Sequence, residues 1–202
     1  MTADFRLIET MRVKEDGDVF LLDRHLHRLR QSARHFSFKH DSEKVHDAIL
    51  EAARPGSTSL RLLLAQSGDI EISAGVIPAS NPERLQISDV AVNSKDSFLY
   101  HKTTRREIYD RARQECSEGA EPLLVNEDDE ITETTITNIA VFREGVWITP
   151  ALSCGLLPGV FRAELLARGD IVEGIIHPDD LNASDPIRCF NALRGMFEAY
   201  LL

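Results

Sequence analysis

In the stretch FLYHKTTRR, residues 98–106, Lys102 follows an apolar segment, residues 98–100, and precedes two threonines. A lysine at the rim of an apolar pocket loses its proton more easily, because burial disfavours the charged form of its amine. An unprotonated amine is what a lysine needs to form a Schiff base with a carbonyl compound. The alternative is an ordinary exposed lysine, which is the more common case. The stretch alone leaves both interpretations open.

Two later stretches favour a polar site. ITETTITN, residues 131–138, places one carboxylate, Glu133, among threonines and an asparagine. A hairpin strand with a polar outer face also explains the threonines. A hairpin strand does not explain the later stretch GLLPGVFR, residues 155–162, as well. That stretch predicts a glycine-containing turn that leads straight into a helix. The backbone N–H groups at the start of such a helix would suit a phosphate.

A basic segment, DRHLHRLRQSARH at residues 23–35, stands out in an otherwise acidic chain. Its apolar positions recur at helical spacing, so one side of the predicted helix faces a core. The basic side chains can be explained as a solvated face. The functional interpretation is that one arginine near the helix start binds a phosphate, since a guanidinium group binds phosphate in a bidentate manner.

The composition limits the classes of protein that fit. The chain has 202 residues, 43% of them hydrophobic, and a formal net charge of -10. That length allows one sizeable core or two small lobes, and an acidic surface disfavours nucleic-acid binding. No apolar run approaches the ~20 residues of a membrane span, and the first ten residues lack the apolar centre of a signal peptide. We therefore expect a cytoplasmic protein without a nucleic-acid or membrane partner.

Neither a disulfide framework nor a metal site is expected. The three cysteines are odd in number and far apart, and no CxxC pair or HExxH pattern is present. The cysteines are Cys116, Cys154 and Cys189.

The pattern of apolar and turn residues predicts a mixed α+β architecture, because few long βαβ units are recognisable. We expect Asp23 to cap the first helix, which would end near Ser37. Two prolines within Pro78–Pro82 predict a linker between a small N-terminal lobe, 1–79, and a larger lobe, 84–202, that carries Lys102. Strands are expected at 5–13, 18–22, 59–66, 69–75, 84–92, 121–125, 131–134, 138–143, 146–149, 171–176 and 187–191, and helices at 23–37, 42–53, 104–117 and 159–168.

The order and spacing of five motifs resemble one family. HLHRL is followed by HKTTRR, TETTITN, GLLPGVFR and FNALRG, and together they span nearly the whole chain. This succession is similar to that of the fold type IV, or class IV, pyridoxal-phosphate enzymes, which include branched-chain aminotransferase, D-amino acid aminotransferase and aminodeoxychorismate lyase. The resemblance implies a two-lobed fold with pyridoxal 5'-phosphate in the cleft between the lobes, and a homodimer.

The resemblance also implies roles for individual residues. Lys102 would carry the cofactor and move protons, Glu133 would bind the pyridine nitrogen, and Arg28 would hold the phosphate. Further contacts to the cofactor are implied for Asn138, for the backbone N–H groups of Val160 and Phe161, and for the loop Asn191, Ala192 and Leu193. Many family members have threonine where this chain has Phe161, so only a backbone donor is expected there.

Within the family the motifs are most similar to those of aminodeoxychorismate lyases. The implied reaction converts 4-amino-4-deoxychorismate to 4-aminobenzoate and pyruvate, a step of folate biosynthesis, and a chorismate-aminating subunit is a possible partner. Aminotransferases of this type often have a tyrosine on the first strand, where this chain has Ile8. Arg61 is a candidate for pairing with a substrate carboxylate. Two alternatives stay open: an aminotransferase for a branched-chain or D-amino acid, and a cofactor-binding or interaction protein without turnover.

Overall fold

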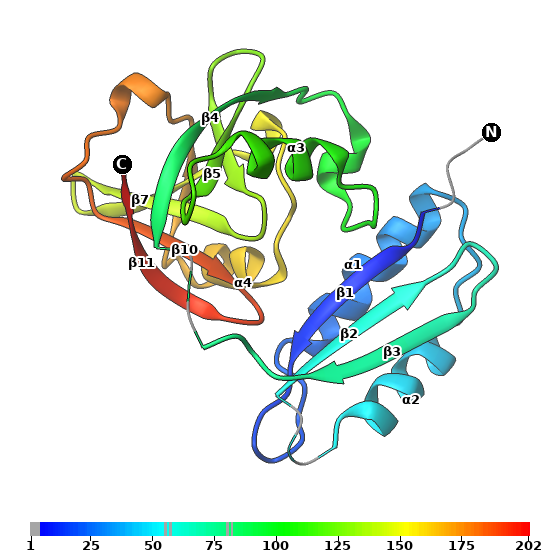
Figure 1. Cartoon of the computed structure of the whole chain (residues 1–202). Helices are drawn as coiled ribbons and strands as arrows, with labels where there is room; N and C mark the ends of the chain where they lie inside the picture. The colour runs from blue at the N-terminus through cyan, green and yellow to red at the C-terminus, as the bar shows by residue number, and fades with distance from the viewer. Residues whose placement is uncertain (1–4, 55, 57, 80, 82) are drawn as a thin grey trace. The chain divides into compact units, whose positions relative to one another are not determined.

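The computed structural model describes residues 5–54, 56, 58–79, 81 and 83–202. The chain divides into two compact units, which we call the N-terminal unit (Met1–Ala79 with His101–Arg105) and the C-terminal unit (Ser80–Tyr100 with Arg106–Leu202). Figure 1 shows that both units combine strands with helices. The predicted α+β class is therefore confirmed.

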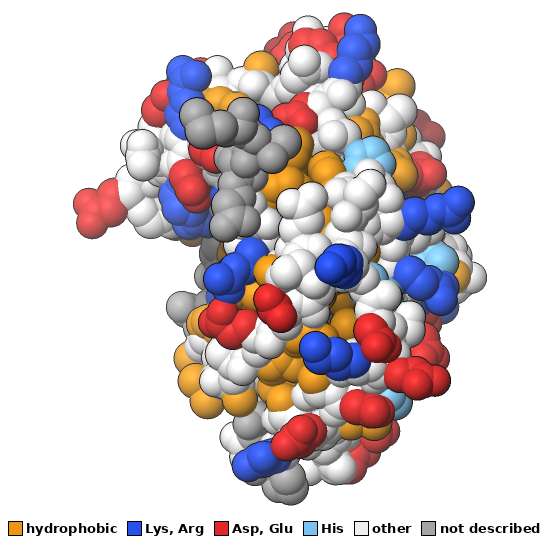
Figure 2. Space-filling model, turned by 90° about the vertical axis from the view of Figure 1, so that its right-hand side faces the viewer, with side chains coloured by type: hydrophobic (Ala, Val, Ile, Leu, Met, Phe, Trp, Pro, Cys, Tyr) orange, Lys and Arg blue, Asp and Glu red, His pale blue; other side chains and the backbone are white. Residues whose placement is uncertain are grey.

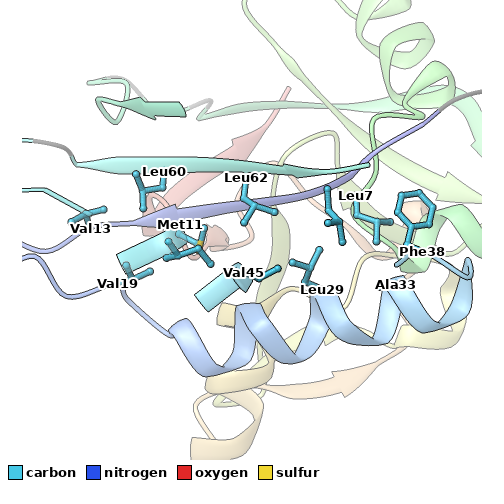
Figure 3. Packing of buried hydrophobic residues seen from close by; sticks show 12 residues of the cluster. Leu7, Met11, Val13, Val19, Leu29, Ala33, Phe38, Val45, Leu60 and Leu62 are labelled. Carbon is cyan, nitrogen blue, oxygen red and sulfur yellow. The ribbon is translucent and has the colours of Figure 1, made fainter. Parts of the chain in front are cut away.

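The N-terminal unit is a three-stranded antiparallel sheet with two helices. Its elements are β1 (Leu7–Arg12), α1 (Leu22–His35), α2 (Ser42–Ala52), β2 (Ser59–Leu64) and β3 (Ile70–Gly75), and the strand order is β1-β2-β3. Figure 3 shows strand residues such as Leu7 and Leu62 directed at Leu29 and Ala33 of α1. All four side chains are at most 1% exposed, so this apolar layer holds α1 against the sheet.

Two details of the first helix differ from the prediction. Residues 18–22 form no strand, and only Val19 makes an isolated bridge, to Val13. The helix does not begin at an Asp23 cap. Leu21 adopts a left-handed conformation with φ 56°, and its carbonyl already accepts the N–H groups of Arg24 and His25. Asp23 consequently lies inside the first turn.

The C-terminal unit is built on one eight-stranded mixed sheet. Its strands are β4 (Arg84–Val92), β5 (Glu121–Asn126), β6 (Ile131–Thr134), β7 (Asn138–Arg143), β8 (Val146–Pro150), β9 (Val172–Gly174), β10 (Ile187–Asn191) and β11 (Gly195–Leu201), and its α-helices are α3 (Glu107–Glu115) and α4 (Val160–Arg168). The strand order is β6-β5-β4-β11-β10-β7-β8-β9. Strand β11 was not predicted, and it pairs antiparallel with β10 and parallel with β4.

The segment that carries Lys102 belongs to the N-terminal unit, whereas the sequence placed it in the second lobe. The carbonyl of Lys102 accepts the N–H of Ile8 at 2.8 Å, and the N–H of Thr104 donates to the carbonyl of Arg6 at 2.9 Å. These bonds attach residues 101–105 to the edge of β1, far away in sequence. Of the predicted linker, Ser80 and Pro82 lie outside the described residues.

The surface carries charges of both signs. On the face in Figure 2, acidic and basic side chains are interspersed, and hydrophobic side chains gather in separate patches. Among the helices in the described part of the chain, none is both long enough and apolar enough to cross a membrane.

Candidate active site

A buried ionic cluster joins α1 to β1 in the N-terminal unit. Glu9 accepts hydrogen bonds from Nε and Nη2 of Arg28 at 2.9 and 2.7 Å. The same carboxylate lies 2.6 Å from Nδ1 of His25. His25 and Arg28 are three residues apart on α1 and therefore share one face of the helix. Glu9 lies two residues from each of the core residues Leu7 and Met11 on β1, so its side chain points to the same face of the strand as theirs, toward α1.

The charges in this cluster shift the proton affinities of its members. Burial alone would raise the pKa of Glu9, but the charge of Arg28 and the hydrogen bonds from His25 and Arg28 lower that pKa to about 2. Burial lowers the pKa of His25, assisted by the charges of Arg28 and Lys102 and opposed by Glu9. Glu9 is therefore an anion paired with Arg28, and His25 donates from Nδ1.

The segment before Lys102 is fixed to α1 by its neighbour in sequence. Nδ1 of His101 lies 2.8 Å from the hydroxyl of Ser32. The ring of His101 stacks on that of His35, with 4.4 Å between the centroids. Burial and the charge of His35 lower the pKa of His101 to about 4. The Lys102 backbone is thus held from both sides, by α1 through His101 and by β1 through Ile8.

In the C-terminal unit, the carboxylate of Glu133 accepts hydrogen bonds from Tyr109, Leu157 and Asn138. Oε1 accepts the phenolic hydrogen of Tyr109 at 2.9 Å and the backbone N–H of Leu157 at 3.1 Å. Oε2 accepts from Nδ2 of Asn138 at 3.2 Å. Glu133 is 5% exposed. A buried carboxylate with several donors is stabilised as the anion and held in one orientation.

Asn138 ties Glu133 to the turn that precedes α4. Its Nδ2 also donates to the carbonyl of Leu157, at 3.0 Å. A Cβ atom built on Gly159 would collide with Oδ1 of Asn138. Gly159 therefore permits the close approach of this turn to the β7 start, and α4 begins at the next residue, Val160.

The start of α4 offers backbone donors rather than side chains. The first N–H groups of an α-helix have no partner within the helix, and they attract anions. The ring of Phe161 packs inward, 6.3 Å from that of Phe190. Val160 is also buried. Only backbone groups of these two residues can serve an anion.

The last predicted loop lies next to the Glu133 segment. Nδ2 of Asn191 donates to the carbonyl of Ile136 at 3.1 Å. Its Oδ1 accepts the N–H groups of Leu193 and Arg194 at 3.0 and 2.8 Å, which closes a turn around Ala192. Glu133, Asn138, the start of α4 and this turn are thus linked by hydrogen bonds within one unit.

The structure does not bring every predicted residue into these clusters. Arg61 lies in the middle of β2, opposite Thr10 and Ser73, and its side chain is exposed. A groove of about 470 Å³ lies between α2 and β3, and no predicted site residue lines it. No group of three or more His, Cys, Asp or Glu in the described ranges could hold a metal ion.

Glu9, His25 and Tyr109 belong to these clusters but were not predicted as site residues from the sequence. A signal for the first two existed, because Glu9 occupies an inward position of an apolar strand. A lone acid there requires a basic partner, which the following helix supplies.

The chain matches the family described as Amino-transferase class IV over residues 6–199. It belongs to that family of enzymes. A Schizosaccharomyces pombe protein named "Putative aminodeoxychorismate lyase" is 30% identical over 201 residues, covering 93% of this chain and 86% of that protein.

Solved structures of the class IV family share the fold. A protein from Mesorhizobium loti, named "Putative amino-acid aminotransferase", is 40% identical with a TM-score of 0.90, over 98% of this chain and 100% of that one. The 4-amino-4-deoxychorismate lyase of Pseudomonas aeruginosa is 23% identical with a TM-score of 0.82, over 98% of this chain and 83% of that one. The second likeness bears on the fold alone.

Proposed function

We propose that this class IV enzyme binds pyridoxal 5'-phosphate and acts as an aminodeoxychorismate lyase. The cofactor requires an amine for its carbonyl carbon, an anion for its ring nitrogen, and donors for its phosphate. The chain offers Lys102, the buried Glu133 carboxylate, and Arg28 with the start of α4. The observation that carries the proposal is Glu133, because a buried carboxylate that its donors hold as an anion in one orientation is the group that a pyridine nitrogen needs beside it.

Lys102 is proposed as the covalent carrier and then the base. When bound, the cofactor supplies an electron sink for the carbon that bears the substrate amino group. The incoming substrate amine would release Nζ of Lys102, and Nζ would then accept the proton from that carbon. The backbone bonds to Ile8 and the anchoring of His101 support this role, because they restrict where the amine can lie.

Glu133 is proposed to hold a proton on the pyridine nitrogen. An anion fixed beside that nitrogen favours its protonated form, which makes the ring a better acceptor of electrons. Asn138 and Tyr109 would act through Glu133 by fixing its orientation.

Arg28 and the backbone at Val160 and Phe161 are proposed to hold the phosphate. Nε and Nη2 of Arg28 both donate to the carboxylate of Glu9, and these two bonds fix the plane of the guanidinium group. The dipole at the start of α4 would add to the attraction. The Asn191–Arg194 turn, with Ala192, is proposed to border the same region.

The choice of lyase over aminotransferase is supported by Ile8. Ile8 adjoins Lys102 through its backbone and is 3% exposed, so the first strand offers no hydroxyl at this position. The name of the Schizosaccharomyces pombe relative agrees with this choice. The name of the Mesorhizobium loti protein favours the alternative, an aminotransferase for an amino acid and a 2-oxo acid.

The test is a comparison of two reactions with the same preparation. The purified holoenzyme is mixed either with 4-amino-4-deoxychorismate or with a panel of amino acids plus 2-oxoglutarate. We expect formation of 4-aminobenzoate and pyruvate to be the faster reaction. Conversion of the cofactor to its pyridoxamine form by an amino acid, with no 4-aminobenzoate formed, would establish the aminotransferase instead.

Three finer features belong to the same proposal. A homodimer is expected, and light scattering of the eluted peak would measure it. A separate subunit that aminates chorismate would supply the substrate, and Arg61 would contact a substrate carboxylate. The presence of Lys102, Glu133 and Arg28 together argues against a protein that binds the cofactor without turnover, because such a protein needs no base.

A further inference from the structure

One buried ring nitrogen of His25 has no hydrogen-bond partner in the part of the chain that the structure describes. Its Nδ1 lies 2.6 Å from the Glu9 carboxylate, whereas Nε2 has no hydrogen-bond partner among the described residues. The side chain is 1% exposed. A buried polar atom without a partner is costly, and in a native structure it points to a bound group or to a change of protonation.

The charged groups around His25 determine the net charge that a phosphate would meet at this cluster. Those that act on it are Glu9 on β1, Arg28 on α1 itself and Lys102 on the segment 101–105. Glu9 and Arg28 are joined through two hydrogen bonds, so the pair carries no net charge. A phosphate monoester dianion that approaches Arg28 therefore meets a cation that Glu9 has already neutralised.

One proton on His25 would restore the missing positive charge. Nδ1 already faces an anion and can remain a donor in both protonation states. A second proton would go to Nε2, the atom for which the described residues provide no partner. Without a phosphate, burial and the charges of Arg28 and Lys102 keep the pKa of His25 below its ordinary value. An arriving dianion acts in the opposite direction.

We propose that Glu9, His25 and Arg28 form a proton-linked anion site, in which His25 takes up a proton from solvent when the cofactor phosphate binds at Arg28. The inference rests on the proposed binding of pyridoxal 5'-phosphate and deepens it. It assigns His25 as a second cationic group for the phosphate and Glu9 as the positioning residue for both. The affinity for the phosphorylated cofactor then falls as the pH rises.

The probe is pyridoxamine 5'-phosphate, which cannot form a Schiff base with Lys102. Its binding to the full-length apoprotein is followed by titration calorimetry in two buffers of different ionisation enthalpy, near neutral pH. The difference in heat between the buffers gives the number of protons taken up. The wild type is expected to take up a number approaching about one proton per molecule bound, and its dissociation constant is expected to rise by up to about tenfold per pH unit.

The matched variants are His25→Asn and His27→Asn. Asparagine can place an N–H near the position of Nδ1 but cannot titrate, so His25→Asn should lose the linked proton and the associated pH dependence. Other groups that titrate on binding are the same in the wild type and in both variants, so their protons cancel when the proton counts are compared. His27 is exposed on the same helix, and its replacement should leave both quantities unchanged.

The outcomes separate this inference from the proposed function. Tight binding by the wild type with no proton uptake overturns the inference and leaves the function standing. Equal proton uptake by the wild type and His25→Asn also overturns it, because another group then carries the proton. No binding of the probe by the wild type overturns both. If His25→Asn does not fold, His25→Gln replaces it in the comparison with the wild type.

Discussion

Tyr109 on α3 donates its phenolic hydrogen to Oε1 of Glu133 on β6, across 2.9 Å. Burial and the negative charge of Glu133 raise the pKa of Tyr109 well above its ordinary value. The phenol therefore remains a donor to the carboxylate across the physiological pH range. This bond, together with those from Asn138 and Leu157, orients the carboxylate that is proposed to face the cofactor.

Tyr109→Phe should lower both stability and turnover. A hydrogen bond to a charged group contributes about 1.5–3 kcal/mol, so the free energy of unfolding should fall by about that amount. Tyr100→Phe is the matched control, because Tyr100 donates its phenolic hydrogen to the carbonyl of Ser94, at 2.7 Å, and not to a carboxylate. Denaturant titration and kcat are measured for both. Equal kcat in the two variants would mean that Tyr109 has only a structural role.

Glu133→Gln should retain the cofactor and turn over slowly. Glutamine has one acceptor oxygen where the carboxylate has two, and it cannot hold a charge beside the pyridine nitrogen. A loss of ~2 kcal/mol in the transition state corresponds to a roughly 30-fold lower kcat. Glu127→Gln is the control, since Glu127 accepts hydrogen bonds from the backbone N–H and the hydroxyl of Ser94. Near-native turnover of Glu133→Gln would indicate that another group protonates the ring.

Arg28→Lys should weaken cofactor binding more than it slows saturated chemistry. Lysine keeps the charge but loses the planar guanidinium group, which binds Glu9 through two hydrogen bonds and is proposed to bind the phosphate as well. Because a phosphate is held equally in the ground and transition states, the dissociation constant should rise roughly tenfold or more while kcat changes little. Lysine is preferred to alanine here, since alanine would leave Glu9 buried without a cation.

Arg30→Lys is the control for that experiment. Arg30 is exposed on the same helix and contacts His27. An equal loss of cofactor affinity in both variants would favour the interpretation of residues 23–35 as a merely basic face.

The Glu9 cluster should make the fold sensitive to acid in a defined range. The pKa of Glu9 falls from 4.5 to about 2 on folding, so its contribution is fully present above pH 4.5 and is lost as the pH falls toward 2. The shift corresponds to stability on the order of 3 kcal/mol. The stability difference between the wild type and Glu9→Gln should therefore shrink below about pH 4.5. A difference that stays constant through that range would contradict the pairing of an ionised Glu9.

Much of the fold was predictable because its elements follow local rules. The strands β2 and β3, with the Ser67–Gly68 turn between them, follow from alternation and a glycine. Strand β11 was missed because it is specified by its pairing with β4, which is remote in sequence. The grouping of Lys102 with β1 was missed for the same reason, because the backbone hydrogen bonds from residues 102–104 to Arg6 and Ile8 do not depend on the local pattern of side chains.

The residues of the candidate site show the same difference between local and remote signals. Lys102, Glu133 and Arg28 were recognisable from motifs, because each lies in a distinctive local stretch. The partners that orient them were not. Tyr109 is separated from Glu133 by 24 positions, and nothing in the EIYDRARQE helix indicates which residue its phenol meets. Glu9 could have been suspected as a lone acid on an apolar strand, but its sharing between His25 and Arg28 required the helix to be placed.

The most direct test of the proposed site is to locate the lysine that carries the cofactor. The purified protein is loaded with pyridoxal 5'-phosphate, reduced with borohydride, digested and mapped by mass spectrometry. We expect a yellow protein and a single labelled peptide with the cofactor fixed to Lys102. We also expect Lys102→Ala to bind the cofactor without covalent attachment and to have no turnover. A label on Lys95 or Lys44 in place of Lys102 would contradict the assignment.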